Sequence, residues 1–197
     1  MSLHPNVQKI AKFITSEIRT IEDKKTKWAS FKRENAQKFN YTGQAHNVLH
    51  EVDRGWSQPL RDMRGMIYDF SVEEPVLVSR GFEKFFNFSE LPENTYDSLT
   101  AKYGNRKFTA REKADGHMIE YFVHNGELCS STRGKFGTVS AEIAGGMFSL
   151  SDFQQVEKTL GKKLMTIVVE LIHPYTEVFV DYDNAETLYL LNAYDSD

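Results

Sequence analysis

A lysine followed closely by an aspartate and a glycine is the most chemically suggestive feature of the sequence. Lys113 lies in residues 112–118 (EKADGHM), between two stretches that are predicted to be strands. A lysine attacks phosphorus only as the neutral amine, so a nucleophilic role requires burial or neighbouring cations that lower its pKa. Gly116 lets the backbone approach a ligand closely or adopt a positive φ. The motif alone is also compatible with a solvated lysine at a strand end.

Four further segments carry cations or an isolated acid at intervals along the chain. They are residues 64–68 (RGMIY), 84–87 (KFFN), 131–135 (STRGK) and 169–174 (VELIHP). Phosphoryl transfer needs in-line positioning and neutralisation of developing negative charge, normally by cations and Mg²⁺. The side chains that can supply positive charge are Arg64, Lys84, Arg133 and Lys135. The same cations would lower the pKa of Lys113 by repulsion between like charges.

Glu170 is an acidic residue on an otherwise apolar predicted strand. Its sequence neighbours are Val168, Val169, Leu171 and Ile172. Burying a carboxylate among such residues is costly without a cation or a ligand. A functional role is therefore favoured over a position at a sheet edge or on an outward face.

In this order the segments resemble the covalent nucleotidyltransferase superfamily of ATP-dependent ligases and mRNA capping enzymes. The resemblance is closer to bacteriophage RNA ligases of the tRNA-repair type and to fungal tRNA ligases. Its most specific element is Lys-Phe-Phe-Asn ahead of Lys-x-Asp-Gly, which DNA ligases do not carry. It runs from about Arg61 to Tyr194. It implies a ligase adenylation fold, ATP and Mg²⁺ (or Mn²⁺) as cofactors, and RNA with 5′-phosphate and 3′-hydroxyl ends as the partner.

The resemblance also implies a role for individual residues. Lys113 matches the lysine that attacks the α-phosphorus of ATP and carries AMP, which then activates an RNA 5′-phosphate for joining to a 3′-hydroxyl. The positions that match nucleotide-binding residues are Arg64, Lys84, Asp115, Gly116, Arg133 and Glu170. Glu170 also matches an acid near the ribose or the metal. Arg133 stands where the phage RNA ligases that the sequence resembles have lysine, and an arginine can bind phosphate bidentately.

The sequence departs from the family pattern in two places. Thr176 and Glu177 occupy the positions of a polar and a basic residue. Two later motifs, a Glu-Gly pair and a Lys-x-Lys run, do not occur before Asp197. We therefore expect an adenylyltransferase core that is incomplete at its C-terminal end and that adenylates itself slowly. A C-terminal portion or a partner chain is expected to supply the missing motifs.

Two other functions stay open at this point. One is a DNA ligase or capping guanylyltransferase, against which the Lys-Phe-Phe-Asn element argues, and which a comparison of ATP with GTP would identify. The other is a catalytically weak nucleotide- or RNA-binding module, since two motifs are absent. Detection of a covalent adduct would separate this module from a ligase.

Short runs of β-branched and aromatic residues predict most of the elements that must position these side chains. The expected strands are residues 64–70, 75–80, 107–113, 116–124, 127–133, 164–172, 177–182 and 187–194. Asn125 and Gly126 predict a tight hairpin between two of them. Helices are expected over 138–147 and over 151–160, the latter capped by Ser151 and ended by Gly161. This content predicts an α+β fold of mainly antiparallel packed sheets with flanking helices.

The N-terminal part of the chain differs in charge from the rest. Residues 1–40 carry nine Lys/Arg and four Asp/Glu, although the net charge of the whole chain is −4. Apolar spacing predicts a helix over 5–21, and the basic stretch after it is interpreted as a second helix to about Phe39. Residues 1–60 are thus expected to form a basic helical segment of the same domain as the adenylyltransferase core, 61–197. Its RNA-binding candidates are Lys24, Lys25 and Lys27, with a solvated helix face as the alternative that charge alone favours.

Composition excludes several classes of protein. The single cysteine, Cys129, rules out an internal disulfide and a cysteine-rich zinc site. No apolar run approaches the roughly 18 residues of a membrane span, so no membrane partner is expected. The N-terminus lacks the apolar core of a signal peptide, which predicts a cytoplasmic protein, in the host cytoplasm if it is phage-encoded.

Overall fold

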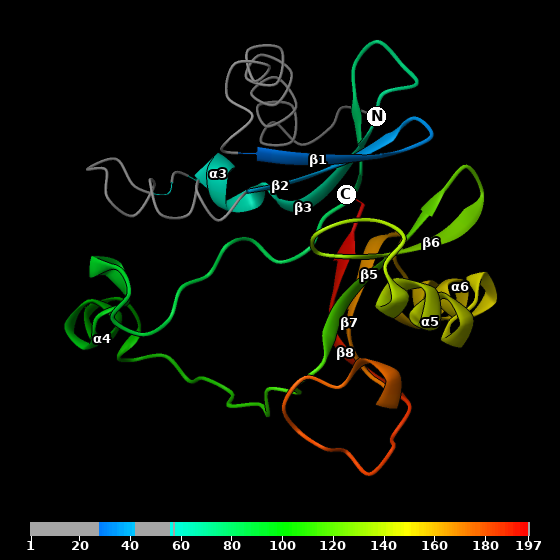
Figure 1. The fold of residues 1–197 in the computed structure, drawn as a ribbon. Coiled ribbons are helices and arrows are strands. Elements are labelled where there is room, and N and C mark those ends of the chain that lie inside the picture. The colour runs from blue at the N-terminus through cyan, green and yellow to red at the C-terminus, as the bar shows by residue number, and fades with distance from the viewer. Residues whose placement is uncertain (1–27, 42–55, 57, 197) are drawn as a thin grey trace.

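The computed structural model describes residues 28–41, 56 and 58–196 of the chain. Within them, two four-stranded sheets form, with strand orders β1-β2-β3-β4 and β6-β5-β7-β8 (Figure 1). Every strand pairs with its neighbours in the antiparallel sense. The described residues also form helices, so the predicted α+β class with mainly antiparallel sheets is confirmed.

The first sheet begins with a hairpin where a helix was expected. Its strands are β1 (Trp28–Arg33), β2 (Ala36–Tyr41), β3 (Arg64–Asp69) and β4 (Val76–Ser79). The prediction of a second helix to about Phe39 is therefore wrong. Strand β2 is hydrogen-bonded on both sides, to β1 and to β3. Sheet pairing of this kind outweighs the modest helix propensity of a basic segment.

The second sheet follows the predicted strands closely. It consists of β5 (His117–His124), β6 (Glu127–Thr132), β7 (Leu164–Ile172) and β8 (Thr187–Asp195). The predicted hairpin between β5 and β6 is confirmed, because Asn125 and Gly126 have φ of 52° and 79°. Positive φ at both central residues is what a type I′ turn requires, and asparagine and glycine adopt it most readily.

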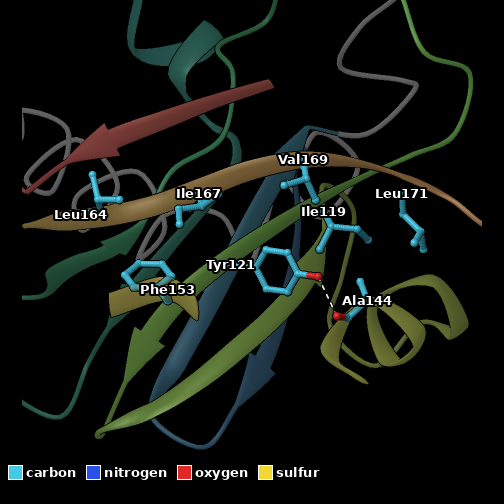
Figure 2. Close-up of a cluster of buried hydrophobic side chains, with 8 residues drawn as sticks. All are labelled: Ile119, Tyr121, Ala144, Phe153, Leu164, Ile167, Val169 and Leu171. Atoms are coloured by element: carbon cyan, nitrogen blue, oxygen red, sulfur yellow. Dashed lines mark hydrogen bonds between the residues drawn. The ribbon is translucent and has the colours of Figure 1, made fainter. Parts of the chain in front are cut away.

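Helices α5 (Val139–Met147) and α6 (Leu150–Leu160) pack against the second sheet and enclose its core. Figure 2 shows this core, in which side chains of β5 and β7 meet residues of the two helices. Its buried members are Ile119, Tyr121, Ala144, Phe153, Leu164, Ile167, Val169 and Leu171. The Tyr121 hydroxyl donates a hydrogen bond of 2.6 Å to the Ala144 carbonyl, which satisfies a buried polar group.

The ends of helix α6 are set by local chemistry. Its N-cap is Ser149 rather than the predicted Ser151, because Ser149 forms a capping box with Asp152. Its C-cap is Gly161, as predicted, in the left-handed conformation with φ of 63°. The cap places the start of β7 directly after the helix.

Two predicted strands are not formed. Residues 107–113 belong to no sheet or helix of the part that the structure describes, and their side chains are exposed. Residues 177–182 form a loop after a short 3₁₀ helix, Pro174–Thr176. The sequence also did not lead us to expect α3 (Gln58–Asp62), the 3₁₀ helix Pro92–Asn94 or α4 (Tyr96–Tyr103).

The two sheets are joined by apolar and polar contacts. Ala36 and Ile67 of the first sheet pack with Phe122 and Cys129 of the second. The Lys38 ammonium on β2 lies 2.6 Å from the Glu120 carboxylate on β5, and both side chains are fully buried. No helix among the described residues is long and apolar enough to cross a membrane.

Candidate active site

A cavity of about 980 Å³ lies where the two sheets and the segment before β5 meet. Its charged lining residues are Arg64, Arg111, Glu112, Lys113, Arg133 and Glu170. Its apolar and aromatic lining residues are Phe82, Phe85, Met118, Tyr182, Tyr189, Leu190 and Leu191. A cavity of this size with apolar walls and a few convergent charges suits a small-molecule ligand.

Lys113 reaches the cavity from the segment that leads into β5. Its side chain is exposed. Three residues later, the backbone N–H of Gly116 donates a hydrogen bond of 3.2 Å to Oε1 of Glu170 on β7. The pairing of Met118 with Glu170 across β5 and β7 fixes this geometry. Lysine and carboxylate are therefore held at the same end of the second sheet.

Only glycine fits at position 116, where the lysine-bearing segment passes β7. A Cβ added there would lie 2.1 Å from the Leu171 carbonyl oxygen and 2.7 Å from Cδ1 of Ile172. Contacts this short cannot be relieved without moving the backbone of β7. The glycine therefore brings the lysine-bearing segment closer to β7 than any residue with a side chain would allow.

Glu170 is half-buried in the cavity wall. Burial raises the pKa of its carboxyl group, whereas the Gly116 N–H and the charges of Lys113 and His117 oppose that shift. A partly desolvated carboxylate beside a lysine is a suitable partner for a ribose hydroxyl or a metal ion. Among the residues that the structure describes, no group of three or more His, Cys, Asp or Glu side chains could hold a metal ion by itself.

Arg64 and Arg133 form a cationic wall of the cavity. Arg64 begins β3, and its guanidinium lies 4.8 Å from the Phe85 ring centroid. Arg133 follows β6 and lies 5.8 Å from the Tyr41 ring centroid. Burial lowers the pKa of Arg64, and repulsion by Arg133 adds to that shift. Two cations that repel each other beside a cavity would be stabilised by an anion such as a polyphosphate.

Lys84 does not line the cavity. Its Nζ donates a hydrogen bond of 2.6 Å to the Phe85 carbonyl and lies 4.0 Å from the Phe86 ring centroid. Burial lowers the pKa of Lys84; nearby Glu90 opposes that shift, and the charges of Arg64 and Arg133 add to it. The charges of Arg64 and Arg133 thus affect the pKa of Lys84, but its ammonium is held by the Phe85 carbonyl and is not part of the cavity lining.

Asp115 also turns away from the cavity. Its Oδ2 accepts hydrogen bonds from the backbone N–H groups of Phe179 (2.8 Å) and Val180 (2.9 Å). Its own N–H donates to the Tyr182 hydroxyl at 2.9 Å. The aspartate therefore ties the loop after β7 to the lysine-bearing segment. These bonds replace the strand that was predicted over 177–182.

The structure thus brings Arg64, Lys113, Gly116, Arg133 and Glu170 to one cavity, although they are far apart in the sequence. Asp115 and Lys84 lie in the surrounding structure. The predicted RNA-binding residues Lys24, Lys25 and Lys27 lie outside the described residues. The roles that the resemblance implies for all these residues stay predictions.

Sequence reasoning missed the buried Lys38–Glu120 pair behind the arginines. Lys38 Nζ also donates a hydrogen bond of 3.0 Å to the Ser131 hydroxyl. Burial raises the pKa of Glu120 and lowers that of Lys38, and the ion pair opposes both shifts. The signal was available, because Glu120 is an acid within an apolar strand in the same way as Glu170.

Comparison with known proteins agrees with the resemblance seen in the sequence. The profile of the family described as RNA ligase matches residues 62–196. A protein of Thermovibrio ammonificans, itself assigned as an RNA ligase by inference, is 31% identical over 129 residues, 65% of this chain and 32% of that protein. RNA ligase 1 of bacteriophage TS2126 is 27% identical over 129 residues, 62% of this chain and 31% of its own length.

A third relative combines two activities in its name. It is an inferred bifunctional polynucleotide kinase/RNA ligase of Autographa californica nuclear polyhedrosis virus, 36% identical over 103 residues. The match covers 48% of this chain and 14% of the viral protein. The chain thus spans about a third or less of the length of the curated relatives it matches. Because the family profile covers more than half of the chain, this protein belongs to the RNA ligase family.

Proposed function

We propose that this chain is the adenylyltransferase core of an ATP-dependent RNA ligase, with the nucleotidyltransferase fold, and that Lys113 is its nucleophile. One observation carries the proposal: a single cavity is lined by Lys113, by the arginine pair Arg64 and Arg133, and by Glu170. Family membership supports it, since the matched residues include all four positions.

The first step is attack by the neutral Lys113 amine on the α-phosphorus of ATP. A bond forms between Nζ and phosphorus, the bond to the pyrophosphate oxygen breaks, and the amine loses a proton to solvent. Arg64 and Arg133 bind the phosphates and neutralise the charge that develops on the leaving group. The apolar side chains Met118, Leu190 and Leu191 provide a surface for the adenine base.

Glu170 is the residue that would hold a divalent cation. Mg²⁺ is commonly bound by one or two carboxylates together with substrate phosphates, so a single carboxylate at the cavity wall fits it or Mn²⁺. When bound, the ion neutralises charge on the phosphates. Glu170 also fixes the Gly116 backbone, and through it the direction from which Lys113 enters the cavity.

The second and third steps use RNA. A 5′-phosphate oxygen of the RNA attacks the phosphorus of lysyl-AMP, and Lys113 leaves as the amine. A 3′-hydroxyl then attacks the activated 5′-phosphate, and AMP leaves as the strands join. RNA ends of this kind arise in tRNA repair, and we propose them as the substrate of the whole protein.

Covalent labelling tests the proposal. The chain is incubated with ATP and Mg²⁺, and the mass increase of AMP is located by peptide mapping. We expect the adduct on Lys113, its loss in Lys113→Ala, and its persistence in Lys107→Ala, a nearby lysine that does not line the cavity. An adduct on another lysine would refute the assignment. An adduct formed from GTP in preference to ATP would indicate a capping enzyme, and nucleotide binding with no adduct would indicate a binding module.

A further inference from the structure

The part of the chain that connects β4 to β5 is long, and it carries exposed rings and cations. After β4 it runs outward to α4 and then returns along residues 104–116 to β5 (Figure 1). Figure 1 shows α4 standing apart from both sheets. The side chains of residues 101–113 are all exposed. A segment so placed contributes little to the core, so its residue types need another explanation.

Residues 102–113 combine positive charge with aromatic rings. They contain five Lys/Arg and one acid, Glu112. The Tyr103 ring lies 5.0 Å from the Lys102 ammonium and 5.7 Å from the Arg106 guanidinium. The Phe108 side chain is 91% exposed. The Phe108 ring is therefore not buried against the rest of the protein and does not stabilise this fold. It is accessible to a ligand.

Aromatic rings interleaved with cations are typical of surfaces that bind single-stranded nucleic acid. The cations attract phosphates, and the rings stack on unpaired bases. A purely apolar protein partner would not favour five cations in the same segment as the ring, and an acidic peptide would not need the exposed phenylalanine. The combination therefore favours an RNA strand.

The segment on the other side of the lysine motif has the opposite charge. Residues 174–186, the loop tied to Asp115, contain four acids and no Lys or Arg. This loop would repel a phosphate backbone, whereas residues 102–111 would attract it. This difference in charge favours an RNA strand that approaches the cavity along residues 102–111 rather than along the acidic loop.

The basic segment leads directly to the nucleophile. Arg111, Glu112 and Lys113 line the cavity, and Phe108 precedes Lys113 by five residues. An extended chain of five residues spans at most about 17 Å. A base stacked on Phe108 would therefore belong to a nucleotide close to the reacting end of the strand.

We propose that residues 102–111 form a binding surface for the single-stranded end of the RNA, with Phe108 as a base-stacking platform and Lys102, Arg106 and Lys107 as phosphate contacts. This proposal rests on the proposed function, because it assigns the path of the RNA to the same site. It concerns RNA binding, however, and it can be tested without ATP.

Fluorescence anisotropy with a short labelled single-stranded RNA, carrying 5′-phosphate and 3′-hydroxyl ends, measures the binding. Phe108→Leu keeps an apolar side chain but removes the ring, and we expect affinity to fall about five- to a hundredfold. Phe108→Tyr keeps the ring and should bind like the wild type. A Lys102→Gln/Arg106→Gln/Lys107→Gln variant should lower the slope of log affinity against log salt by up to about 2, since each contact to a single strand contributes about 0.7.

A matched control removes three other lysines. Lys158, Lys162 and Lys163 lie at the end of α6 and just after it, and a Lys158→Gln/Lys162→Gln/Lys163→Gln variant changes the net charge equally. We expect this variant to bind RNA with nearly wild-type affinity. Equal weakening in both triple variants, unchanged affinity in Phe108→Leu, or equal affinity for duplex RNA would overturn the proposal.

Self-adenylation separates this proposal from the proposed function. The residues changed here do not line the cavity. Phe108→Leu should therefore form the Lys113 adduct at the wild-type rate. If the adduct never forms but RNA binding changes as described, the proposed function fails and the RNA surface stands. If the adduct forms but RNA binding does not depend on Phe108, only the RNA surface fails.

Discussion

Glu170 on β7 accepts a hydrogen bond from the backbone of Gly116, three residues after Lys113, at 3.2 Å. The bond joins the acid of one motif to the turn that carries the proposed nucleophile. The same carboxylate lies in the wall of the cavity and is half-buried. We propose that this one residue both orients the backbone and offers negative charge to a ligand.

Glu170→Gln should separate these tasks through its dependence on pH. Burial raises the pKa of Glu170 in the folded protein, so its contribution to stability is fully present below the unfolded pKa and is lost as pH rises through the folded pKa. Glutamine has no such loss and can still accept the Gly116 bond. The melting temperature of Glu170→Gln relative to wild type should therefore increase from about pH 4 towards neutral pH.

The same variant should lose adenylation at neutral pH, because glutamine is a poor ligand for Mg²⁺ and cannot balance Lys113. Thermal melts and adduct formation measured on one preparation check both statements. A variant whose stability relative to wild type falls as pH rises would show that the ionised carboxylate stabilises the free protein.

Gly116→Ala should disturb both the fold and the site. The added Cβ would meet the Leu171 carbonyl oxygen at 2.1 Å, and forcing such a contact typically costs about 1–3 kcal/mol. Because β7 must shift to relieve it, we also expect slower formation of the Lys113 adduct.

Gly146→Ala is the matched control, since a Cβ placed there would have no heavy atom within 4 Å other than its chain neighbours and the nearby backbone of its own helix. Gly146 belongs to helix α5, where alanine is favoured over glycine by about 0.5–1 kcal/mol. Denaturant unfolding should show opposite signs for the two substitutions. Equal effects would mean that the close approach of Gly116 to β7 has no energetic consequence.

Local turn chemistry could be predicted from the sequence, whereas contacts between distant residues could not. Asn125-Gly126 and Gly161 define a hairpin and a helix end by local backbone chemistry, and both were predicted. Residues 177–182 were predicted as a strand, but the N–H groups of Phe179 and Val180 bond to Asp115 instead. A partner 64 positions away leaves no signal in the segment itself.

The candidate site could likewise be predicted only in part. The ordered motifs predicted that Arg64, Lys84, Arg133 and Glu170 would lie with Lys113 on one pocket. The structure places all of them except Lys84 around one cavity. The position of the Lys84 ammonium over the Phe86 ring could not be predicted, because it depends on how the chain turns after β4. Motifs identify residue types that suit a reaction, whereas the packing of the chain decides where each side chain points.

Arg133→Ala should weaken ATP binding by about ten- to a hundredfold, since a hydrogen bond to a charged group contributes about 1.5–3 kcal/mol. Arg133→Lys keeps the charge but loses the planar fork, and its loss should be smaller. Arg106→Ala removes an exposed arginine away from the cavity and serves as the control.

Isothermal titration with ATP distinguishes these outcomes. Burial lowers the pKa of Arg64, and repulsion by the charge of Arg133 adds to that shift. Removing Arg133 therefore also removes this repulsion from the free protein. We therefore expect Arg133→Ala to bind ATP less well without being less stable. A large loss of stability in this variant would contradict the assignment of Arg133 to phosphate binding.

The buried Lys38–Glu120 pair should respond differently to single and double substitution. Both side chains are inaccessible to solvent, and Oε1 of Glu120 has no hydrogen-bond partner among the described residues. Removing one partner leaves an uncompensated buried charge, which typically costs about 3–5 kcal/mol. Lys38→Met or Glu120→Leu alone should lower the free energy of unfolding by about that amount.

The double variant Lys38→Met/Glu120→Leu should be more stable than either single variant, since two apolar side chains of similar size can replace a buried ion pair at little cost. A double-mutant cycle from urea unfolding gives the coupling energy directly. Glu120 lies beside the backbone of Gly65, next to Arg64, and its charge partly offsets the repulsion between Arg64 and Arg133. Without that charge the two arginines repel each other more strongly, and a bound polyphosphate relieves more repulsion. The double variant should therefore still form the Lys113 adduct and require less ATP to do so. An ATP dependence equal to that of the wild type would indicate that the ion pair only holds the two sheets together.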